Sequence, residues 1–162
     1  MSPKRTMVST ISEIIAKRTR NRSNAWRIFI PITPVPASRP RVARNGGVHY
    51  GKNYEKFRKE ARRLIQEWDM PPEFPLDGPL AVSVSFYLIP PKKPKNIYPK
   101  GDVDNYFKTL DAFNNVVWVD DSQIVWENTT KQYREIEGIE LEVGIVERIP
   151  KTRALPKVWV EG

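Results

Sequence analysis

Short runs rich in apolar and β-branched residues predict four main β-strands along this chain. The first run is Trp26–Thr33, WRIFIPIT, in which Pro31 indicates an edge strand or a strand end. The second is Leu80–Ile89, where apolar residues alternate with serines. Residues 123–149 predict two further strands that are joined at Glu137-Gly138. Together the four strands predict a mixed sheet.

Two other stretches have apolar residues at spacings of three and four, which predicts amphipathic helices. Residues 53–69, NYEKFRKEARRLIQEWD, form the clearer helix. The cations on its polar face form either a phosphate-binding ridge or an ordinary solvated face, since glutamates are interleaved with them. Residues 103–115 predict a second helix, with Asp102 as its N-cap. The side chains that this helix offers to the core are Val103, Tyr106, Phe107, Leu110 and Phe113.

A proline-rich segment, PVPASRPRVARNGGVHY, lies between the first strand and the first helix. The prolines keep it extended, and Asn45-Gly46-Gly47 is a turn signal that predicts a small hairpin of RVAR with VHY. Arg39, Arg41 and Arg44 would then lie on a stiff mount, and arginine forks suit phosphate groups. The alternative is that they are three surface arginines with no partner.

A second basic segment, PPKKPKNIYPKGD at residues 90–102, runs directly into an acidic stretch. Its composition predicts a loop rather than a packed element. We expect Lys92, Lys93, Lys95 and Lys100 to capture a phosphodiester backbone there; the alternative is a flexible surface loop. Residues 1–25 form either a basic arm that adds phosphate contacts or a solvated tail.

Composition limits the kinds of protein that this chain can be. Its 162 residues fit one domain. The sequence contains no run of about 18 apolar residues, so no transmembrane helix is predicted. It has no Cys and one His, which excludes disulfides, thiolate sites and His-rich zinc sites. The absence of Cys fits the cytosol. The net charge is +8, and residues 1–100 hold 20 Lys/Arg against 7 Asp/Glu, which predicts a polyanionic partner.

Five of the seven aspartates lie within residues 101–121, although the chain as a whole is basic. Such a cluster is unfavourable unless a cation lies among the carboxylates. Asp104, Lys108 and Asp111 share one face of the predicted helix, and Asp120 and Asp121 precede the next strand. We expect three or four of the carboxylates to converge near the start of the helix, where its dipole also favours anions.

Carboxylate oxygens favour Mg²⁺ or Mn²⁺, and a metal of this kind activates water for phosphodiester hydrolysis. A nearby lysine would neutralise developing charge. The alternative is purely structural: Asp102 caps a helix, Asp104 pairs with Lys108, and Asp120-Asp121 forms a turn.

The run GDVDNYFKTLDAFNN…WVDDSQIV resembles the RusA family of Holliday-junction resolvases, whose pattern is D-x-D-N-x-x-K…D-A…W-x-D-D-x-Q-(V/I). The resemblance spans about residues 26–147, and it divides the chain into a basic N-terminal arm (1–25), a RusA-like nuclease domain (26–147) and a C-terminal extension (148–162). The matching residues are Asp102, Asp104, Asn105, Lys108, Asp111, Ala112, Trp118, Asp120, Asp121, Gln123 and Ile124.

The resemblance implies an α+β homodimer that acts as a Mg²⁺-dependent endodeoxyribonuclease, in the cytoplasm of a bacterial or phage-infected host cell. It would resolve four-way DNA junctions by paired symmetric nicks during recombination and repair. Asp102, Asp104 and Asp121 would bind the metal with support from Asp120, and Lys108 would be the catalytic cation. A two-fold dimer also suits the approximate two-fold symmetry of a junction.

Two other functions stay open. The first is that of a metal-dependent nuclease for other branched or single-stranded nucleic acid. The second is that of a non-catalytic DNA-binding protein, although the complete set of acids in the motif speaks against that.

Overall fold

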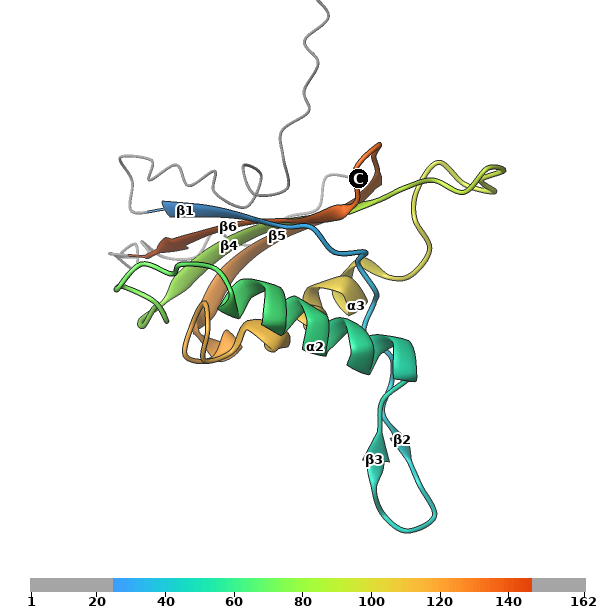
Figure 1. The fold of residues 1–162 in the computed structure, drawn as a ribbon, viewed down its shortest axis with the longest axis horizontal. Helices are drawn as coiled ribbons and strands as arrows, with labels where there is room; N and C mark the ends of the chain where they lie inside the picture. The colour runs from blue at the N-terminus through green and yellow to red at the C-terminus, as the bar shows by residue number, and fades with distance from the viewer. Residues whose placement is uncertain (1–24, 147–162) are drawn as a thin grey trace, which may run out of the picture.

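The computed structural model describes residues 25–146, so the predicted N-terminal arm, apart from Ala25, and the C-terminal extension lie outside the described residues. The described chain has an α+β fold whose main feature is a four-stranded mixed sheet in the order β1-β6-β4-β5 (Figure 1). The strands are β1 (Ala25–Ile30), β4 (Leu80–Leu88), β5 (Ile124–Tyr133) and β6 (Gly138–Ile145). The predicted mixed sheet is therefore confirmed.

The first strand lies at an edge of the sheet, as Pro31 indicates. Among residues 25–146, β1 pairs with β6 alone, in antiparallel orientation, and it ends at Ile30, directly before the proline. Proline has no amide hydrogen to donate to a neighbouring strand, so the strand ends where that donor is missing.

Alternation along the central strands places their apolar side chains on one face of the sheet. Val82, Val84 and Phe86 of β4 are buried, and so are Leu141 and Val143 of β6. Burying a side chain of this size is worth about 1.5–3 kcal/mol, so this face supplies much of the stability of the sheet.

Helix α2 (Lys52–Gln66) covers this apolar face of the sheet (Figure 1). Its side chains Tyr54, Phe57, Ala61 and Ile65 are buried, as the spacing predicts. On its outer side Arg63 contacts both Glu60 and Glu67, at 2.5 and 2.6 Å. At this end of α2, the polar surface is therefore a solvated face of intrahelical ion pairs.

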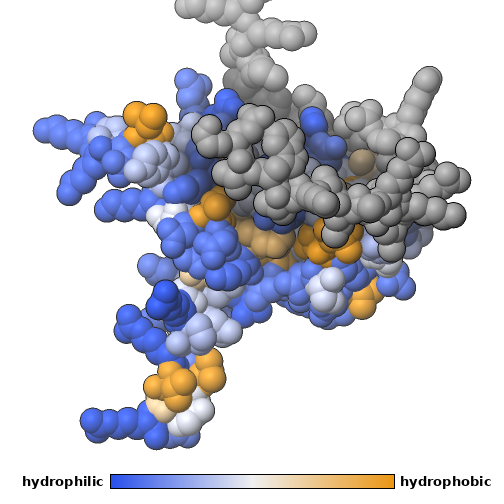
Figure 2. Space-filling model, turned by 180° about the vertical axis from the view of Figure 1, so that it is seen from behind, coloured by the Kyte–Doolittle hydropathy of each residue, from blue (hydrophilic) through white to orange (hydrophobic). Residues whose placement is uncertain are grey.

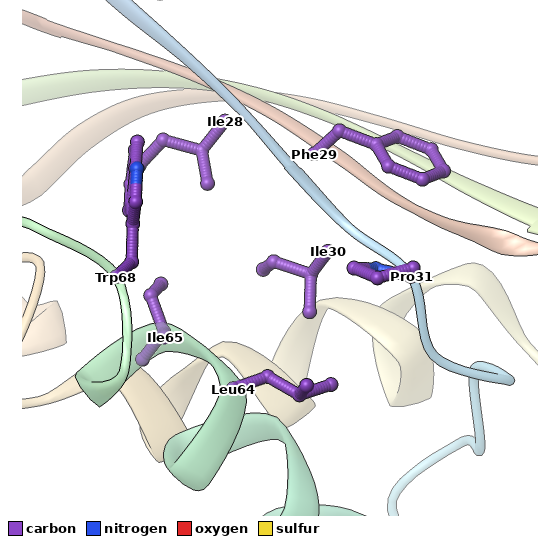
Figure 3. Close-up of a pocket in the computed structure, with 7 residues that line it drawn as sticks. All are labelled: Ile28, Phe29, Ile30, Pro31, Leu64, Ile65 and Trp68. Atoms are coloured by element: carbon purple, nitrogen blue, oxygen red, sulfur yellow. The ribbon is translucent and has the colours of Figure 1, made fainter. Parts of the chain in front are cut away.

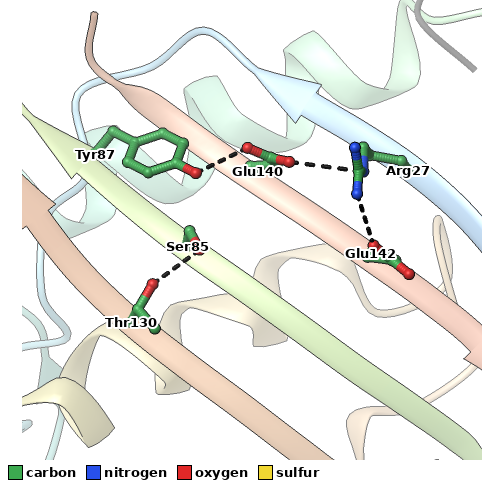
Figure 4. Close-up of polar contacts among 6 residues, drawn as sticks. All are labelled: Arg27, Ser85, Tyr87, Thr130, Glu140 and Glu142. Carbon is green, nitrogen blue, oxygen red and sulfur yellow. Dashed lines mark hydrogen bonds and ion pairs between the residues drawn. The ribbon is translucent and has the colours of Figure 1, made fainter. Parts of the chain in front are cut away.

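The opposite face of the sheet carries polar cross-strand contacts (Figure 4). Arg27 contacts Glu142 at 3.2 Å, and the hydroxyl of Tyr87 donates to Glu140 at 2.8 Å. The Thr130 hydroxyl lies 2.8 Å from Ser85 Oγ on the neighbouring strand. Among the described residues, both helices lie on the other side of the sheet, which explains the apolar-in, polar-out alternation.

A small apolar pocket lies between β1 and α2 (Figure 3). None of the side chains that line it carries a charge, so it offers no group for phosphate chemistry. The lining residues are Ile28, Phe29, Ile30, Pro31, Leu64, Ile65 and Trp68.

The acidic stretch is part of the crossover between two parallel strands. β4 and β5 pair in parallel, so the chain must return to the same end of the sheet between them. The returning segment contains helix α3 (Val103–Phe107) and the 3-10 helices η1 (Lys108–Phe113) and η2 (Asp121–Gln123). The fold therefore brings the carboxylates to one edge of the molecule by a connection that the sheet requires.

The predicted single helix over residues 103–115 is corrected by the structure. The α-helix ends at Phe107 and continues as the tighter η1. Thr109 contributes to this change because its hydroxyl donates to the carbonyl of Tyr106 at 2.6 Å. Val103, expected in the core, has 41% of its surface exposed because it is the first residue of the helix.

Candidate functional site

The first half of the site lies where the basic loop enters α3. Gly101 has a φ of +90°, a conformation that suits glycine, and Asp102 follows at the N-cap. The Asp102 side chain makes no capping hydrogen bond, which corrects the expectation that it caps the helix through its carboxylate. One turn on, Lys108 Nζ lies 3.1 Å from Asp104 Oδ2. The hydrogen bond from Lys108 lowers the pKa of Asp104, which is therefore ionised at neutral pH.

The second half of the site lies against α2. Asp111 is half-buried, with Oδ2 3.4 Å from the Arg58 guanidinium and Oδ1 3.5 Å from the Tyr54 hydroxyl. Burial raises the pKa of Asp111, and the negative charge of Asp121 raises it further, while Arg58 opposes this shift. Burial, together with Asp111, raises the pKa of Tyr54 to about 12. Tyr54 therefore stays a neutral donor beside the carboxylate.

The two adjacent aspartates before β5 have different surroundings. Asp120 accepts a hydrogen bond from the Ser122 amide at 2.8 Å, and its own amide donates to Gln123 Oε1 at 2.8 Å. This capping box begins η2, and the bond from Ser122 lowers the pKa of Asp120. Asp121 accepts a bond from the Asn114 side chain at 3.3 Å.

The structure thus brings the predicted site residues together in two groups. Asp104 pairs with Lys108, and Asp111 lies close enough to Asp121 to be affected by its charge. Over residues 25–146, no three His, Cys, Asp or Glu side chains form a group that could hold a metal ion. The set of three ligands that the resemblance implies, Asp102, Asp104 and Asp121, therefore stays a prediction.

The chemistry of these donors fits a hard divalent cation. All are carboxylates, and oxygen ligands are those that Mg²⁺ and Mn²⁺ prefer. Burial is the main cause of the raised pKa of Asp111, and the negative charge of Asp121 adds to it. A cation bound beside the two carboxylates would relieve their mutual repulsion.

The predicted basic loop ends at a fixed position beside α3. Its lysines Lys92, Lys93, Lys95 and Lys100 are all exposed. Lys131 of β5 donates to the carbonyls of Pro99, at 2.7 Å, and Gly101. The Tyr106 hydroxyl donates to the carbonyl of Lys100 at 2.8 Å. The fixed end of the loop therefore places Lys100 two residues before Asp102, while the rest of the loop projects from the body of the protein (Figure 1).

The predicted hairpin is confirmed as β2 (Arg41–Val42) paired antiparallel with β3 (Val48–His49). It projects from the body of the protein, with Arg39, Arg41 and Arg44 exposed (Figure 1). Its base is bonded to the site, since the amide of Ala37 donates to the carbonyl of Asn105 in α3 at 2.7 Å.

Sequence reasoning did not single out Tyr54, Arg58 or Asn114 as parts of the site. The spacing of apolar residues puts Tyr54 on the apolar face of the helix and Arg58 on its polar face, and the two are one helical turn apart at the boundary between the faces. The available signal was their spacing of four residues, which places two side chains next to each other on a helix. Their partner, Asp111, is more than fifty residues away in sequence and could not be identified from the local pattern.

The chain resembles known proteins over most of the described residues. A family model described as endodeoxyribonuclease RusA matches residues 31–144. The chain is 34% identical over 127 residues to the uncharacterized protein YqaN of Bacillus subtilis (strain 168), an overlap that covers 68% of this chain and 89% of that protein. Within the part of the chain that the structure describes, no helix is long and apolar enough to cross a membrane.

Proposed function

The chain belongs to the RusA endodeoxyribonuclease family, and from this premise we propose that it resolves four-way DNA junctions by paired, symmetric, Mg²⁺-dependent nicks during recombination and repair. The observation that carries the proposal is the position of the family motif. The motif lies on the β4–β5 crossover, where Asp104 pairs with Lys108 and the charge of Asp121 acts on Asp111. A basic hairpin and a basic loop are both bonded to the same crossover.

In this proposal Asp102, Asp104 and Asp121 hold Mg²⁺, with Mn²⁺ able to replace it. When bound, such a metal polarises a phosphoryl oxygen and lowers the pKa of a coordinated water. The chain orients these ligands through the N-terminus of α3 and through η2. Asp120 supports them, because its capping box fixes the start of η2 beside Asp121.

Lys108 supplies the mobile positive charge of the site. It is exposed, and it pairs with Asp104. A phosphate that gains negative charge in the transition state would attract the same ammonium group, since hydrogen-bond donors placed at developing charge stabilise it. Lys108 therefore has a role at the scissile phosphate as well as a role in holding Asp104.

The exposed cations hold the DNA backbone on either side of the carboxylates. Each phosphate contact releases counterions, so affinity should fall steeply with salt. The hairpin would grip one arm of the junction, and the basic loop would bind the strand that enters the site. These contacts come from Arg39, Arg41, Arg44, Lys92, Lys93, Lys95 and Lys100.

The enzyme is proposed to act as a homodimer. A four-way junction has approximate two-fold symmetry, and a two-fold dimer presents two equal sites to strands of the same polarity. One bound dimer could then make both nicks before it leaves the junction.

A cleavage assay on three labelled substrates tests this function. The protein is incubated with a four-way junction, a Y-fork and a linear duplex, each with Mg²⁺ or with EDTA. We expect symmetric nicks in the junction alone and no product in EDTA. Equal cutting of all three substrates would favour a nuclease of broader structure preference, and tight binding without cutting would favour a non-catalytic DNA-binding protein.

The variant Asp104→Asn tests the role of the carboxylate in the same assay. It keeps the size of the side chain but removes its charge, so junction binding should stay within about threefold while cleavage falls by at least about a thousandfold. Glu135→Gln, a change of the same kind at an exposed position in the β5–β6 turn, is the matched control. Retained cutting by Asp104→Asn would refute the metal role.

A further inference from the structure

The β2–β3 hairpin carries an apolar pair at its outer end. Val42 and Val48 pair directly across the two strands, so their side chains lie together on one face. Val42 has 76% of its surface exposed and Val48 has 58%. The apolar patch is visible at the end of the projecting hairpin in Figure 2. We call these two residues the valine pair.

The turn of the hairpin holds the valine pair in a defined arrangement. Across the turn the amide of Ala43 donates to the carbonyl of Gly47 at 2.7 Å, and the amide of Gly46 donates to the carbonyl of Ala43 at 2.9 Å. Gly46 has a φ of +81°, which this tight turn requires. The valine pair is therefore presented by hydrogen-bonded backbone.

The base of the hairpin is bonded to the two helices that carry the site. On the entering side the amide of Ala37 bonds to Asn105 of α3, and on the leaving side the amide of Gly51 donates to Ser38 Oγ at 3.0 Å. Tyr50 then packs edge-on against Tyr54 of α2, with ring centroids 5.6 Å apart.

The contact continues from the hairpin to the carboxylates through one arginine. The Arg58 guanidinium lies 5.9 Å from the Tyr50 ring centroid and 3.4 Å from Asp111. Direct contacts thus connect the base of the hairpin with Asp111 on the acidic crossover. The hairpin that presents the valine pair is therefore anchored at its base to the elements that carry the carboxylates.

The charges around the valine pair identify its partner. Residues 31–54 contain Arg39, Arg41, Arg44 and Lys52 and no acidic residue. Contact between the hairpins of two copies would bring like charges together, which is unfavourable. A polyanion that also exposes apolar surface satisfies both features, and nucleic acid at a branch point does so because its base faces are accessible there.

We propose that the valine pair is a wedge that enters the branch point of the DNA and unstacks the base pairs beside it. Arg41 and Arg44 hold the flanking phosphates while the apolar side chains occupy the space between bases. The inference rests on the proposed junction cleavage, which it deepens by naming the residues that select a branch point. From Ser38 to Val42 the extended chain reaches about 13 Å, the rise of about four base pairs.

The test uses the full chain and a four-way junction with 2-aminopurine at single positions within four nucleotides of the branch point. Fluorescence of this base rises when it loses its stacking neighbours. Ca²⁺ replaces Mg²⁺ so that the DNA stays uncut during the measurement. The variant is Val42→Thr with Val48→Thr, which keeps side-chain shape and strand propensity but adds two hydroxyls.

We expect wild-type protein to raise the fluorescence at least about twofold at one or more positions, and the double variant to lose most of that rise. Junction affinity should change by less than about threefold, because the phosphate contacts remain. In Mg²⁺ the variant should cut a fully paired junction about tenfold more slowly. It should recover most of its rate on a junction whose branch point is already mismatched.

Ile136→Thr is the matched control, since Ile136 has 57% of its surface exposed in the β5–β6 turn, away from the hairpin. Thermal melts of each variant check that the fold is kept. An unchanged fluorescence rise in the double variant, or equal slowing on paired and mismatched junctions, would overturn the wedge. So would a change in the monomer–dimer equilibrium without any change in fluorescence, because it would assign the valine pair to a second copy of the chain.

The wedge and the proposed function fail in different ways. Wild-type protein that cuts junctions without raising the fluorescence would contradict the wedge and leave junction cleavage intact. Wild-type protein that raises the fluorescence but cuts no branched DNA would contradict the proposed cleavage and leave the wedge in place.

Discussion

At the scale of single residues, Asp111 is a carboxylate whose surroundings disfavour its charged form. Burial and the charge of Asp121 both raise its pKa, and the nearby Arg58 only partly offsets them. The ionised carboxylate is therefore less favourable in the folded protein than in water. A residue held in this way is typical of a functional site, where stability and activity are opposed.

Replacing Asp111 by Asn should therefore stabilise the protein at neutral pH. The amide keeps the shape of the side chain and removes the charge that the surroundings disfavour. We expect the melting temperature at pH 7 to rise by about 1–3 °C, measured by circular dichroism. Glu135→Gln, at an exposed position, should leave the melting temperature unchanged.

The stability gained by Asp111→Asn should increase with pH. Because the folded pKa of Asp111 is raised, the protonated form is the one that folding favours. The stability from this group is fully present below the unfolded pKa of about 3.9 and is lost as pH rises through the folded value. The advantage of Asp111→Asn should thus be absent below about pH 4 and grow above it. A variant that melts below wild type at pH 7 would contradict this account.

At the scale of elements, the crossover depends on one glutamine that joins two segments. Gln123 Nε2 donates to the carbonyls of Leu76 and Gly78 at 3.1 and 2.8 Å, and its Oε1 accepts the amide of Asp120. The connector before β4 is thereby bonded to η2, the short helix that begins with Asp121. The same side chain completes the capping box and fixes the position of a candidate metal ligand.

The variant Gln123→Ala should lose both the capping box and the support of Asp121. Two carbonyls and one amide lose their partner, so the free energy of unfolding should fall by about 1–3 kcal/mol in urea denaturation. Cleavage should fall further than stability explains, because Asp121 loses its support. Gln66→Ala, at an exposed position near the end of α2, is the control and should change the free energy by less than about 0.5 kcal/mol. Equal effects of the two substitutions would contradict the role of Gln123.

Local patterns predicted the elements that depend on local physics. Alternation located β1 and β4, and the three–four spacing located α2. The glycines of the turn predicted the position of the hairpin, because the turn needs a positive φ at Gly46 and glycine adopts that conformation readily. These features need no knowledge of distant partners.

The remaining features depend on contacts between distant segments or on small energy differences. The parallel pairing of β4 with β5 is invisible in either strand alone, since the strand composition does not identify its neighbour. The change from α3 to η1 at Phe107 turns on bonds such as that of Thr109, which a spacing of three or four residues does not reveal. The contact of Arg58 with Asp111 likewise joins two elements that only the tertiary fold brings together.

At the scale of the whole molecule, charge and symmetry act together. The basic hairpin and the basic loop are both bonded to the acidic crossover, so in the proposed function cations that bind DNA flank carboxylates that bind a metal. A two-fold dimer would present two such surfaces to one junction. Paired nicks then require that both copies be active at the same time.

Mixed dimers of wild-type and Asp104→Asn subunits test this requirement. The two forms carry different tags, are co-expressed and are purified through both tags. On a supercoiled plasmid with an extruded cruciform, wild-type dimers should give linear product, and mixed dimers should give mainly nicked circles. We expect the linear fraction to fall about tenfold. Mixed dimers that linearise the plasmid as fast as wild type would contradict concerted cutting by two subunits.

The order of the strands has a consequence for the timing of synthesis. β6 comes last along the described chain, yet it lies between β1 and β4 and is bonded to both. Until residues 138–145 leave the ribosome, β1 has no partner in the sheet and β4 lacks one of its two neighbours. A message that is cut short before Gly138 therefore yields a chain without one of the two inner strands of the sheet. The strand order therefore makes translation through residue 145 a condition for the complete four-stranded sheet.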